Sequence, residues 1–400
     1  MRFHPRLHCA RSTDEFVFHQ LVPYLGNKRH LLELIGAAVD ACGIEPARGT
    51  FLDAFAGSGV VARYAKQRGF AVIANDWEPY ARVLNTAAIG CDAPPACAAL
   101  GGYSAAIARL NALPGSDGWV TGNLCPVDDD APDPHRERLF YRRATGRRID
   151  AIRAQIAAWQ HDGLVDDEAA CCLLAPLLYQ ACWLANTSGV FKGFHAGWGG
   201  RNGTALHRIL ADLHLQPARF LGSGRGHRVL AVDAQALREH VAEPVDIAYL
   251  DPPYNQHPYA SNYHVLNSLV LWDRPELPPA TMRGSKAAIR TDWQQRRSAF
   301  NHRTSAPAAY AALLGALDAR VVLTSYSTDG TIPLARLVAT AGERGALSVT
   351  CRSYKRYRTS PTRPSPRATN VEFVLSCDTR GRRRRGDVDA VLERIAASAT

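Results

Sequence analysis

The fold class of this chain is decided by one stretch of sequence, Thr50-Phe51-Leu52-Asp53-Ala54-Phe55-Ala56-Gly57-Ser58-Gly59. Its apolar first half predicts a strand over 50–55, and its two glycines predict a tight turn into a helix over 59–69. A second apolar run predicts a strand over 70–74, and Pro79 opens a further helix, as proline does in a first turn. This alternation of strands and helices predicts a parallel sheet with crossover helices, and therefore an α/β fold.

The same alternation continues on both sides of this stretch. Upstream, apolar residues at helical spacing predict a helix soon after Lys28. Downstream, apolar runs predict three strands and a helix, over 228–232, 245–250, 320–326 and 262–271 respectively. Two further runs, 347–354 and 370–377, predict a β-hairpin. We therefore expect a mostly parallel sheet that ends in a C-terminal β-hairpin.

The segment between about residues 90 and 225 interrupts this alternation. Residues 91–145 are rich in proline, glycine and aspartate, helical spacing returns over 148–186, and a glycine-rich segment follows over 189–203. The simplest organisation is one α/β domain with a largely helical insertion. The predicted parts are a leader over 1–20, the α/β domain over 21–90 and 226–378, the insertion over 91–225, and a basic tail over 379–400.

The composition restricts the class of protein. The 400 residues carry a net charge of +10, and all but five of the 47 basic residues are arginine, which predicts a surface that attracts polyanions such as nucleic acid. The first 20 residues lack the apolar core of a signal peptide, and no run of 18 apolar residues predicts a membrane span. Ten scattered cysteines without a C-x-x-C pattern indicate reduced thiols. These features predict a cytoplasmic protein.

A second motif, Asp251-Pro252-Pro253-Tyr254, follows the apolar run 245–250. An aspartate, a rigid proline turn and an aromatic ring at the end of one strand are suited to hold a flat ring that bears an amino group. Asp251 accepts one hydrogen bond from that amino group, and the carbonyl oxygen of Pro252 accepts a second. Tyr254 stacks on the face of the ring. The alternative is a strand that ends in a proline turn with an exposed carboxylate, and four residues alone do not decide between the two.

The glycine turn is compatible with two kinds of cofactor. The segment Gly57-Ser58-Gly59-Val60-Val61-Ala62 fits the dinucleotide pattern G-x-G-x-x-G/A, and Asp76 lies where an acid that binds ribose is expected. A nicotinamide-dependent oxidoreductase is therefore one hypothesis. Against it, Asp53 places negative charge near the site of a pyrophosphate, whereas the ammonium of a sulfonium cofactor favours a carboxylate there. The upstream segment Tyr24-Leu25-Gly26-Asn27-Lys28 also has no role in a dinucleotide fold.

Four motifs occur in a fixed order along the chain: Tyr24-Leu25-Gly26-Asn27-Lys28, Asp53-x-Phe55-x-Gly57-x-Gly59, Asn75-Asp76 and Asp251-Pro252-Pro253-Tyr254. In this order the chain resembles the Dam-like DNA adenine-N6 methyltransferases of the alpha arrangement, in which a target-recognition region lies between the cofactor half and the catalytic motif. Three further segments, around Asn262-Tyr263-His264, Tyr326 to Gly330 and Tyr354-x-x-Tyr357, look like members that accompany restriction enzymes. The resemblance implies a Rossmann-like class I fold that uses S-adenosyl-L-methionine.

The resemblance also implies roles for individual residues. Those expected to bind the cofactor are Tyr24, Lys28, Asp53, Phe55, Gly57, Asp76, Asp233 and Asp251. Lys28 is expected near the cofactor's carboxylate, Asp76 at its ribose hydroxyls and Asp233 at its adenine, although an aspartate after a strand is also commonly a helix cap. The residues expected to carry the reaction are Asp251, Pro252 and Tyr254, without a metal.

The substrate that the resemblance implies is duplex DNA, with adenine N6 as the methyl acceptor after base flipping. A basic, aromatic segment of the hairpin is expected to contact the DNA, namely Arg352, Tyr354, Lys355, Arg356, Tyr357 and Arg358. The segment 191–201 is a second candidate, and a cognate restriction endonuclease is an implied partner. Cytosine-N4 transfer, methylation of an RNA base and an inactive DNA-binding module stay open as alternatives.

Overall fold

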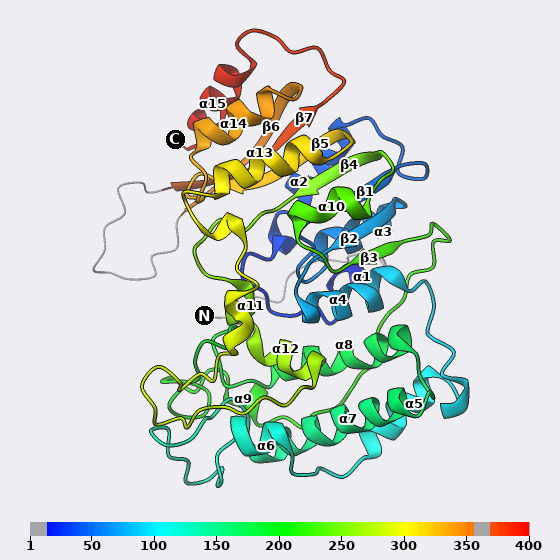
Figure 1. Cartoon of the computed structure of the whole chain (residues 1–400), viewed down its shortest axis with the longest axis vertical. Coiled ribbons are helices and arrows are strands. Elements are labelled where there is room, and N and C mark those ends of the chain that lie inside the picture. Colours follow the sequence, from blue (N-terminus) through cyan, green and yellow to red (C-terminus); the bar gives the residue numbers. More distant parts are fainter. Residues whose placement is uncertain (1–13, 356–368, 400) are drawn as a thin grey trace.

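The computed structural model describes residues 14–355 and 369–399, in which a twisted sheet lies above a layer of helices (Figure 1). The strands are β1 (Thr50–Asp53), β2 (Ala71–Asn75), β3 (Arg228–Leu230), β4 (Val245–Leu250), β5 (Ala319–Ser327), β6 (Ala346–Lys355) and β7 (Thr369–Asp378). They form one sheet in the order β3-β2-β1-β4-β5-β7-β6, in which β7 alone runs against the others. The expected α/β fold, with a mostly parallel sheet and a C-terminal hairpin, is confirmed.

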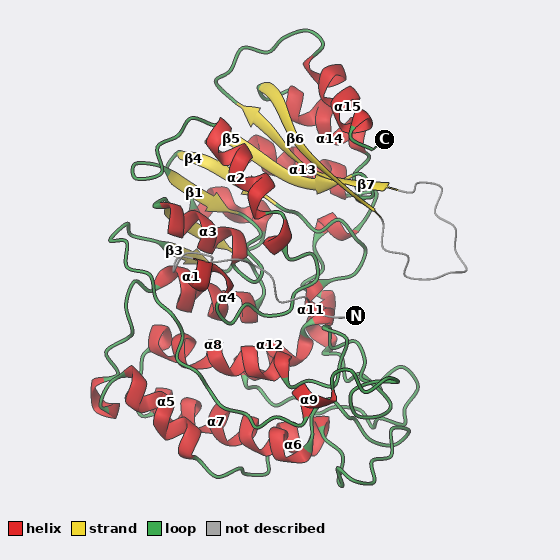
Figure 2. Ribbon diagram, turned by 180° about the vertical axis from the view of Figure 1, so that it is seen from behind, coloured by secondary structure: helices red, strands yellow, loops and turns green. Residues whose placement is uncertain are grey.

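Helices cover both faces of this sheet (Figures 1 and 2). One face carries α1 (Asp14–Phe18), α2 (Leu32–Ala41) and α3 (Val60–Arg68). The other carries α10 (Leu237–His240), α13 (Ala306–Ala316), α14 (Leu334–Gly342) and α15 (Asp387–Ala397). Successive strand residues alternate between the two cores: Phe51 joins the first and Leu52 the second. A parallel sheet is buried on both faces in this way, which explains why its strands are short apolar runs.

A third apolar core holds the helical layer below the sheet. Its helices are α4 (Pro79–Asn85), α5 (Tyr103–Ala112), α6 (Trp119–Leu124), α7 (Arg143–His161), α8 (Asp167–Trp183) and α12 (His264–Leu271), and two short helices, α9 (Leu206–Ile209) and α11 (Tyr259–Asn262), lie nearby. Helix α4 precedes the predicted insertion, and α12 follows the motif Asp251–Tyr254. This core is therefore not built by residues 91–225 alone. The helical layer is therefore joined to the α/β domain by shared packing.

The described parts of the predicted leader and of the predicted tail each contain a helix. Residues 14–18 of the predicted leader form α1, which buries Phe16 and Val17 against the α2–α3 side of the sheet. Within the predicted basic tail, α15 buries Val391 and Ile395 against the opposite side. Because α1 has only five residues, it is too short to show helical spacing in the sequence.

The direction of the strands decides which loops meet. The carboxyl ends of β1, β2, β3 and β4 lie at one edge of the sheet, which we call the carboxyl edge. Because β7 runs antiparallel to β5, with Ser327 opposite Glu372, the end of β6 and the start of β7 also lie at this edge. Asp378, which pairs with Val321, lies at the other edge, and the arginine run 382–385 follows it there.

None of the helices in the described ranges has the length and apolar character needed to cross a membrane. The described cysteines form no disulfide, and most of them are buried.

Candidate active site

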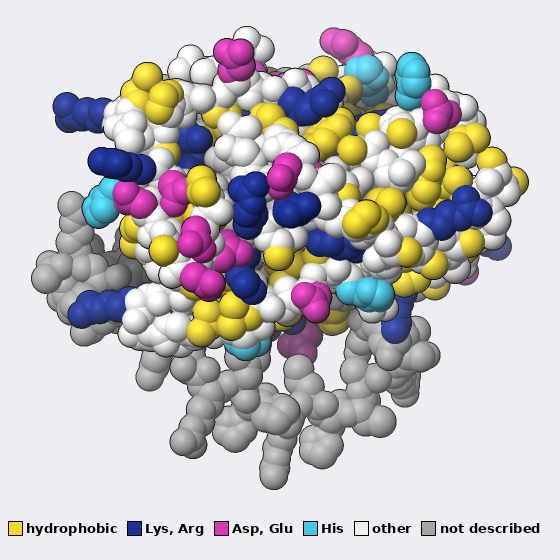
Figure 3. All heavy atoms as spheres, turned by 90° about the horizontal axis from the view of Figure 1, so that it is seen from below, with side chains coloured by type: hydrophobic (Ala, Val, Ile, Leu, Met, Phe, Trp, Pro, Cys, Tyr) yellow, Lys and Arg dark blue, Asp and Glu magenta, His cyan; other side chains and the backbone are white. Residues whose placement is uncertain are grey.

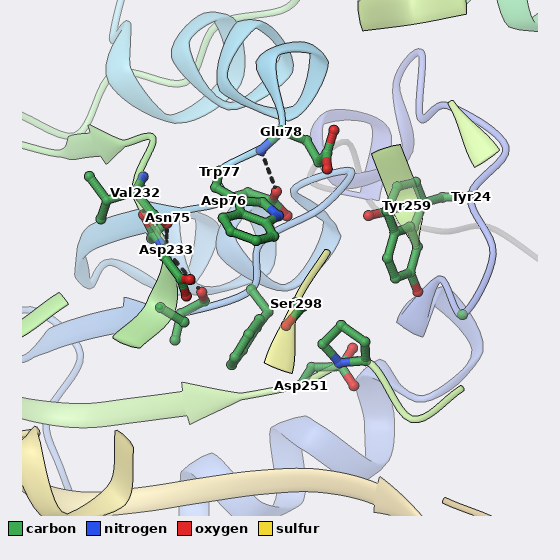
Figure 4. Close-up of a pocket in the computed structure, with 15 residues that line it drawn as sticks. Tyr24, Asn75, Asp76, Trp77, Glu78, Val232, Asp233, Asp251, Tyr259 and Ser298 are labelled. Atoms are coloured by element: carbon green, nitrogen blue, oxygen red, sulfur yellow. Dashed lines mark hydrogen bonds between the residues drawn. The ribbon is translucent and has the colours of Figure 1, made fainter. Parts of the chain in front are cut away.

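A pocket with about 570 Å³ of open space lies at the carboxyl edge of the sheet (Figure 4). Five of the eight residues predicted to bind the cofactor line it: Tyr24, Phe55, Asp76, Asp233 and Asp251. The lining residues that sequence reasoning missed include Trp77, Glu78, Tyr259 and Ser298. Lys28, Asp53 and Gly57 do not line the pocket themselves, although each lies close to residues that do.

The turn after β2 fixes the orientation of Asp76. One carboxylate oxygen of Asp76 accepts a hydrogen bond from the backbone N–H of Gly57 at 2.9 Å, and the other accepts one from that of Glu78 at 3.0 Å. Burial raises the pKa of Asp76 to about 6, although these two hydrogen bonds oppose the rise. The aspartate is thus held rigidly between the glycine turn and the start of α4, and its remaining lone pairs face the pocket.

Asn75 joins three strand ends beneath this turn. Its side-chain NH₂ donates to the carbonyl oxygens of Ala54 and Val232, both at 3.1 Å, and its side-chain oxygen accepts from the backbone N–H of Val232. The two residues of the Asn75-Asp76 motif therefore have different roles. Asn75 connects the residues that follow β1 and β3, and Asp76 faces the pocket. Asp233 follows directly, and it both lines the pocket and caps the short helix after it by accepting from the N–H of Gln235.

Gly57 allows a close approach of the Tyr24 ring. Its backbone has φ +51°, and a Cβ atom at this position would lie 2.8 Å from the ring of Tyr24. Only glycine combines this left-handed conformation with such a contact. The Tyr24 ring in turn stacks on Tyr259, at 5.0 Å between centroids, and on Tyr263, at 5.1 Å.

Two tyrosine hydroxyls hold the backbone beside Tyr24. The N–H of Leu25 donates to the hydroxyl of Tyr263 at 2.7 Å, and the hydroxyl of Tyr259 donates to the carbonyl of Leu25 at 3.0 Å. The motif Tyr24–Lys28 is therefore attached to α11 and α12, which follow the motif Asp251–Tyr254 by only a few residues. This attachment places Tyr24 and Tyr259 in the same pocket wall.

Lys28 and Asp251 form an ion pair at the tip of β4. The Lys28 ammonium lies 2.9 Å from Asp251 Oδ2, and the two side chains are 3% and 16% exposed. Burial works to lower the pKa of Lys28, but the Asp251 carboxylate outweighs burial and raises this pKa well above its usual value. The other carboxylate oxygen, Asp251 Oδ1, is buried and has no hydrogen-bond partner within residues 14–355 and 369–399. An acceptor is thus left for a ligand.

Tyr254 and Asp53 complete the surroundings of this pair. Lys28 Nζ lies 3.3 Å from the hydroxyl of Tyr254 and 4.9 Å from the centre of its ring, and the edge of this ring meets Tyr326. Asp53 is 1% exposed, and burial, followed by the nearby Asp251 carboxylate, raises its pKa well above the usual value. A positively charged group bound here would relieve this concentration of negative charge.

Glu78 is the clearest residue that the sequence analysis missed. Its side chain is almost completely buried, at 1% exposure, and lines the pocket. Glu78 Oε2 accepts from the side-chain NH₂ of Asn267 on α12 at 2.7 Å, whereas Oε1 is buried and has no partner in the described structure. Burial raises the pKa of Glu78 to about 8. The sequence around Glu78 does not indicate that this side chain lines a pocket, because its hydrogen-bond partner Asn267 is almost 190 residues away.

Three of the six predicted DNA-binding residues lie on strand β6 of the hairpin. Arg352 is on β6, where it donates to the carbonyl oxygen of His30 at 3.0 Å and lies 3.5 Å from the carboxylate of Glu33. Tyr354 and Lys355 end β6 at the carboxyl edge. The remaining three, Arg356, Tyr357 and Arg358, lie outside the described residues. The role of this segment in DNA binding stays a prediction.

The donor set of the pocket fits S-adenosylmethionine. Four carboxyl groups line the same space, and two of them, Asp251 and Glu78, carry buried oxygen atoms that have no hydrogen-bond partner in the described part of the chain. Such a wall suits a ligand with a sulfonium and an ammonium group better than a pyrophosphate. Phe55 and Trp77 add flat apolar surface for an adenine ring. The nicotinamide alternative has no comparable support in this pocket.

Substituting Gly57 tests the packing of the pocket wall. We expect Gly57→Ala to weaken cofactor binding at least tenfold and to lower the free energy of unfolding by about 1–3 kcal/mol, because its Cβ would collide with Tyr24 and strain the backbone. Gly43→Ala is a matched control, since Gly43 also has positive φ, +62°, but an added Cβ meets nothing within 4 Å. Calorimetric titration and urea unfolding measure both effects. Equal cofactor affinity in the two variants would contradict this account.

Glu78 makes stability depend on pH. Its pKa rises from 4.5 to about 8 on folding, so the folded protein keeps a proton that the unfolded chain releases, and the free energy of unfolding falls as pH rises between these values. Glu78→Gln removes this contribution. Relative to wild type, we expect the variant to gain roughly a few kcal/mol of stability between pH 5 and pH 8. Urea unfolding at several pH values measures this gain, with the exposed Glu239→Gln as control, and parallel curves for Glu78→Gln and wild type would contradict the expectation.

Comparison with known proteins agrees with the function that the geometry of the pocket indicates. The model of the family "D12 class N6 adenine-specific DNA methyltransferase" matches residues 24–307. The chain is 29% identical to the type II methyltransferase M.NlaIII of Neisseria lactamica, over 88% of this chain and 96% of that protein. It is 28% identical to the modification methylase StsI of Streptococcus sanguinis, over 77% of this chain but 44% of that protein. No solved structure matches the chain significantly.

The family match covers well over half of the chain, including all four sequence motifs and the lining of the pocket up to Ser298. It confirms the resemblance to DNA adenine-N6 methyltransferases and settles the choice between adenine and cytosine at the level of the family. The chain belongs to the D12 class of N6 adenine-specific DNA methyltransferases.

Proposed function

We propose that this chain transfers a methyl group from S-adenosylmethionine to N6 of an adenine within a short sequence of duplex DNA, as the modification enzyme of a restriction system. The observation that carries the proposal is the buried, unpartnered Oδ1 of Asp251, which lies at the tip of β4 beside the acidic pocket. The names of the relatives, a type II methyltransferase and a modification methylase, support the role in restriction and modification. A cognate endonuclease is then the expected partner.

The residues of the pocket divide the binding of the cofactor among them. Asp76, held by two backbone N–H groups, is placed to accept hydrogen bonds from ribose hydroxyls. Asp233 and the ring of Phe55 are placed to bind the adenine part, and the carboxyl groups of Asp53 and Asp251 favour the positive charge of the amino-acid part. When bound, S-adenosylmethionine supplies an electrophilic methyl group attached to its sulfonium sulfur.

The reaction requires that the target adenine leaves the duplex. Its amino nitrogen is buried in the base pair, and extrusion costs a few kcal/mol of stacking and pairing. Stacking on Tyr254 offsets roughly 1–3 kcal/mol of that cost. Asp251 Oδ1 and the carbonyl oxygen of Pro252 then accept the two amino hydrogens, and these bonds orient the nitrogen lone pair toward the methyl carbon.

Bond making and proton loss follow in that order. With S-adenosylmethionine bound, the nitrogen would take the methyl group, and the sulfur would keep the electrons of the broken C–S bond. The nitrogen is then positively charged and acidic, and it gives one proton to Asp251 Oδ1 or to water. Prior removal of the proton is excluded, because a carboxylate is far too weak a base for a neutral aromatic amine.

Lys28 prepares Asp251 for this role. Its ammonium occupies Oδ2, so that Oδ1 alone is presented to the base. The same pairing allows a carboxylate to remain in a buried position, where an unpaired charge would be costly. Lys28 therefore acts as a positioning residue rather than as a ligand of the cofactor.

The test is the methylated nucleoside that the protein produces, measured by mass spectrometry after incubation of plasmid DNA with S-adenosylmethionine. We expect N6-methyladenine from the wild type and a rate reduced by roughly 10²-fold or more in Asp251→Asn, which presents a weaker acceptor to the amino group and no base for its proton. Cofactor affinity should change only severalfold. Asp246→Asn is the matched control, since Asp246 lies on the same strand at its opposite end, and it should methylate as wild type does.

A second variant separates catalysis from folding. Removal of Asp251 alone leaves Lys28 buried without its partner, which destabilises a protein by about 3–5 kcal/mol. The double variant Lys28→Met, Asp251→Ala removes both charges and should fold, bind cofactor and fail to methylate. N4-methylcytosine as the product, or a wild-type rate in Asp251→Asn, would overturn the proposal.

A further inference from the structure

A groove with about 1110 Å³ of open space lies next to the active-site pocket. It is lined by the chain segment 18–30 and by Tyr179 and Trp183 at the end of α8. Tyr24 and Gly26 line both the groove and the pocket, so the two spaces share this part of their walls. The mechanism proposed above does not use the groove.

The groove combines exposed aromatic rings with basic side chains. Trp183 is 40% exposed and Phe18 is 39% exposed, so both side chains present aromatic surface to solvent. Arg29 lines the groove, and its guanidinium lies 5.7 Å from the centre of the Phe18 ring. Arg208 lies outside the lining, with its guanidinium 5.5 Å from the centre of the Trp183 ring. No acidic residue is among the described residues that line the groove. Aromatic surface interleaved with arginine is the chemistry that binds nucleotides by stacking and by phosphate contact.

The groove also connects two parts of the molecule that flank the pocket. At one end, the carbonyl oxygen of His30 accepts a hydrogen bond from Arg352 of β6, the strand that leads into the hairpin. At the other end, Trp183 closes α8 of the helical layer. A strand of DNA that delivers a base to the pocket past Tyr24 therefore meets the groove on its way between the hairpin and the helical layer.

Other basic surfaces of the chain are less suited to this task. The arginine run 382–385 follows β7 at the edge of the sheet opposite to the pocket. The face beneath the helical layer shows basic, acidic and apolar side chains in mixture (Figure 3). Neither surface places positive charge next to the point where the extruded adenine has to enter.

We propose that the groove binds a nucleotide that flanks the methylated adenine, with its base against Trp183 and its phosphate near Arg29. The inference rests on the proposed function and assigns to this site a part of the DNA that the pocket itself does not hold. The aromatic rings and the arginine of the lining match the base and the phosphate of a nucleotide. The shared wall at Tyr24 and Gly26 places this nucleotide one or a few positions from the adenine along the strand.

The test measures fluorescence anisotropy of a labelled 30-base-pair duplex that contains the sequence found to be methylated in plasmid DNA. Trp183→Ala should weaken binding about tenfold at every salt concentration, because stacking is not ionic, and Trp183→Phe should retain most of the affinity. Arg29→Ala should weaken binding and reduce the slope of log affinity against log salt by about 1. Arg384→Ala, the same change of charge at the opposite edge, is the matched control and should leave affinity and slope as in wild type.

The outcomes separate this inference from the proposed function. A wild-type protein that does not methylate DNA would reject the proposed function itself. If the wild type methylates DNA while Trp183→Ala and Arg29→Ala, shown to be folded by their thermal unfolding, bind the duplex with wild-type affinity and salt slope, the groove does not hold DNA. In that case, a change of self-association in the same variants, measured by sedimentation, would assign the groove to a second copy of the chain.

Discussion

The ion pair between Lys28 and Asp251 is the interaction on which the site depends. It joins the first motif of the chain to the last one across more than 220 residues of sequence, at a distance of 2.9 Å and with little exposure to water. A charge buried in this way is tolerated only with its partner in place, so the two motifs become stable together. Because of this ion pair, the two oxygen atoms of Asp251 have different surroundings. Oδ2 is held by the lysine, and Oδ1 is left as an acceptor in the pocket.

Around this pair, three regions of the chain meet at the carboxyl edge of the sheet. The glycine turn after β1 orients Asp76 through the N–H of Gly57, and Asn267 of α12 holds Glu78 on the far side of the same turn. The hydroxyls of Tyr259 and Tyr263 hold the backbone beside Tyr24. The helical layer therefore also shapes this site, because its helices α4 and α12 fix part of the wall of the pocket. A rigid pocket of this kind orients a weak nucleophile without chemical activation.

The sequence predicted the sheet and much of the site because both leave local signals. Short apolar runs marked the strands, and the motifs at their ends marked Asp76, Asp233 and Asp251, since parallel strands bring such ends to one edge. The lining residue Glu78 and the ion pair of Lys28 left no such signal, because each depends on a partner far away in sequence. Ser298 lies in a loop without periodicity. The helix α1 was missed because its five residues are too few to show helical spacing in the sequence.

One measurement tests the central claim most directly: the distance between Asp251 Oδ1 and the target base in a crystal structure of the protein with its DNA and S-adenosylhomocysteine. The account predicts an adenine outside the helix, with its amino nitrogen at about 3 Å from Oδ1 and Lys28 still paired with Oδ2. A target adenine that stays in the duplex, or one bound outside the pocket while Oδ1 finds a partner within the protein, would contradict it.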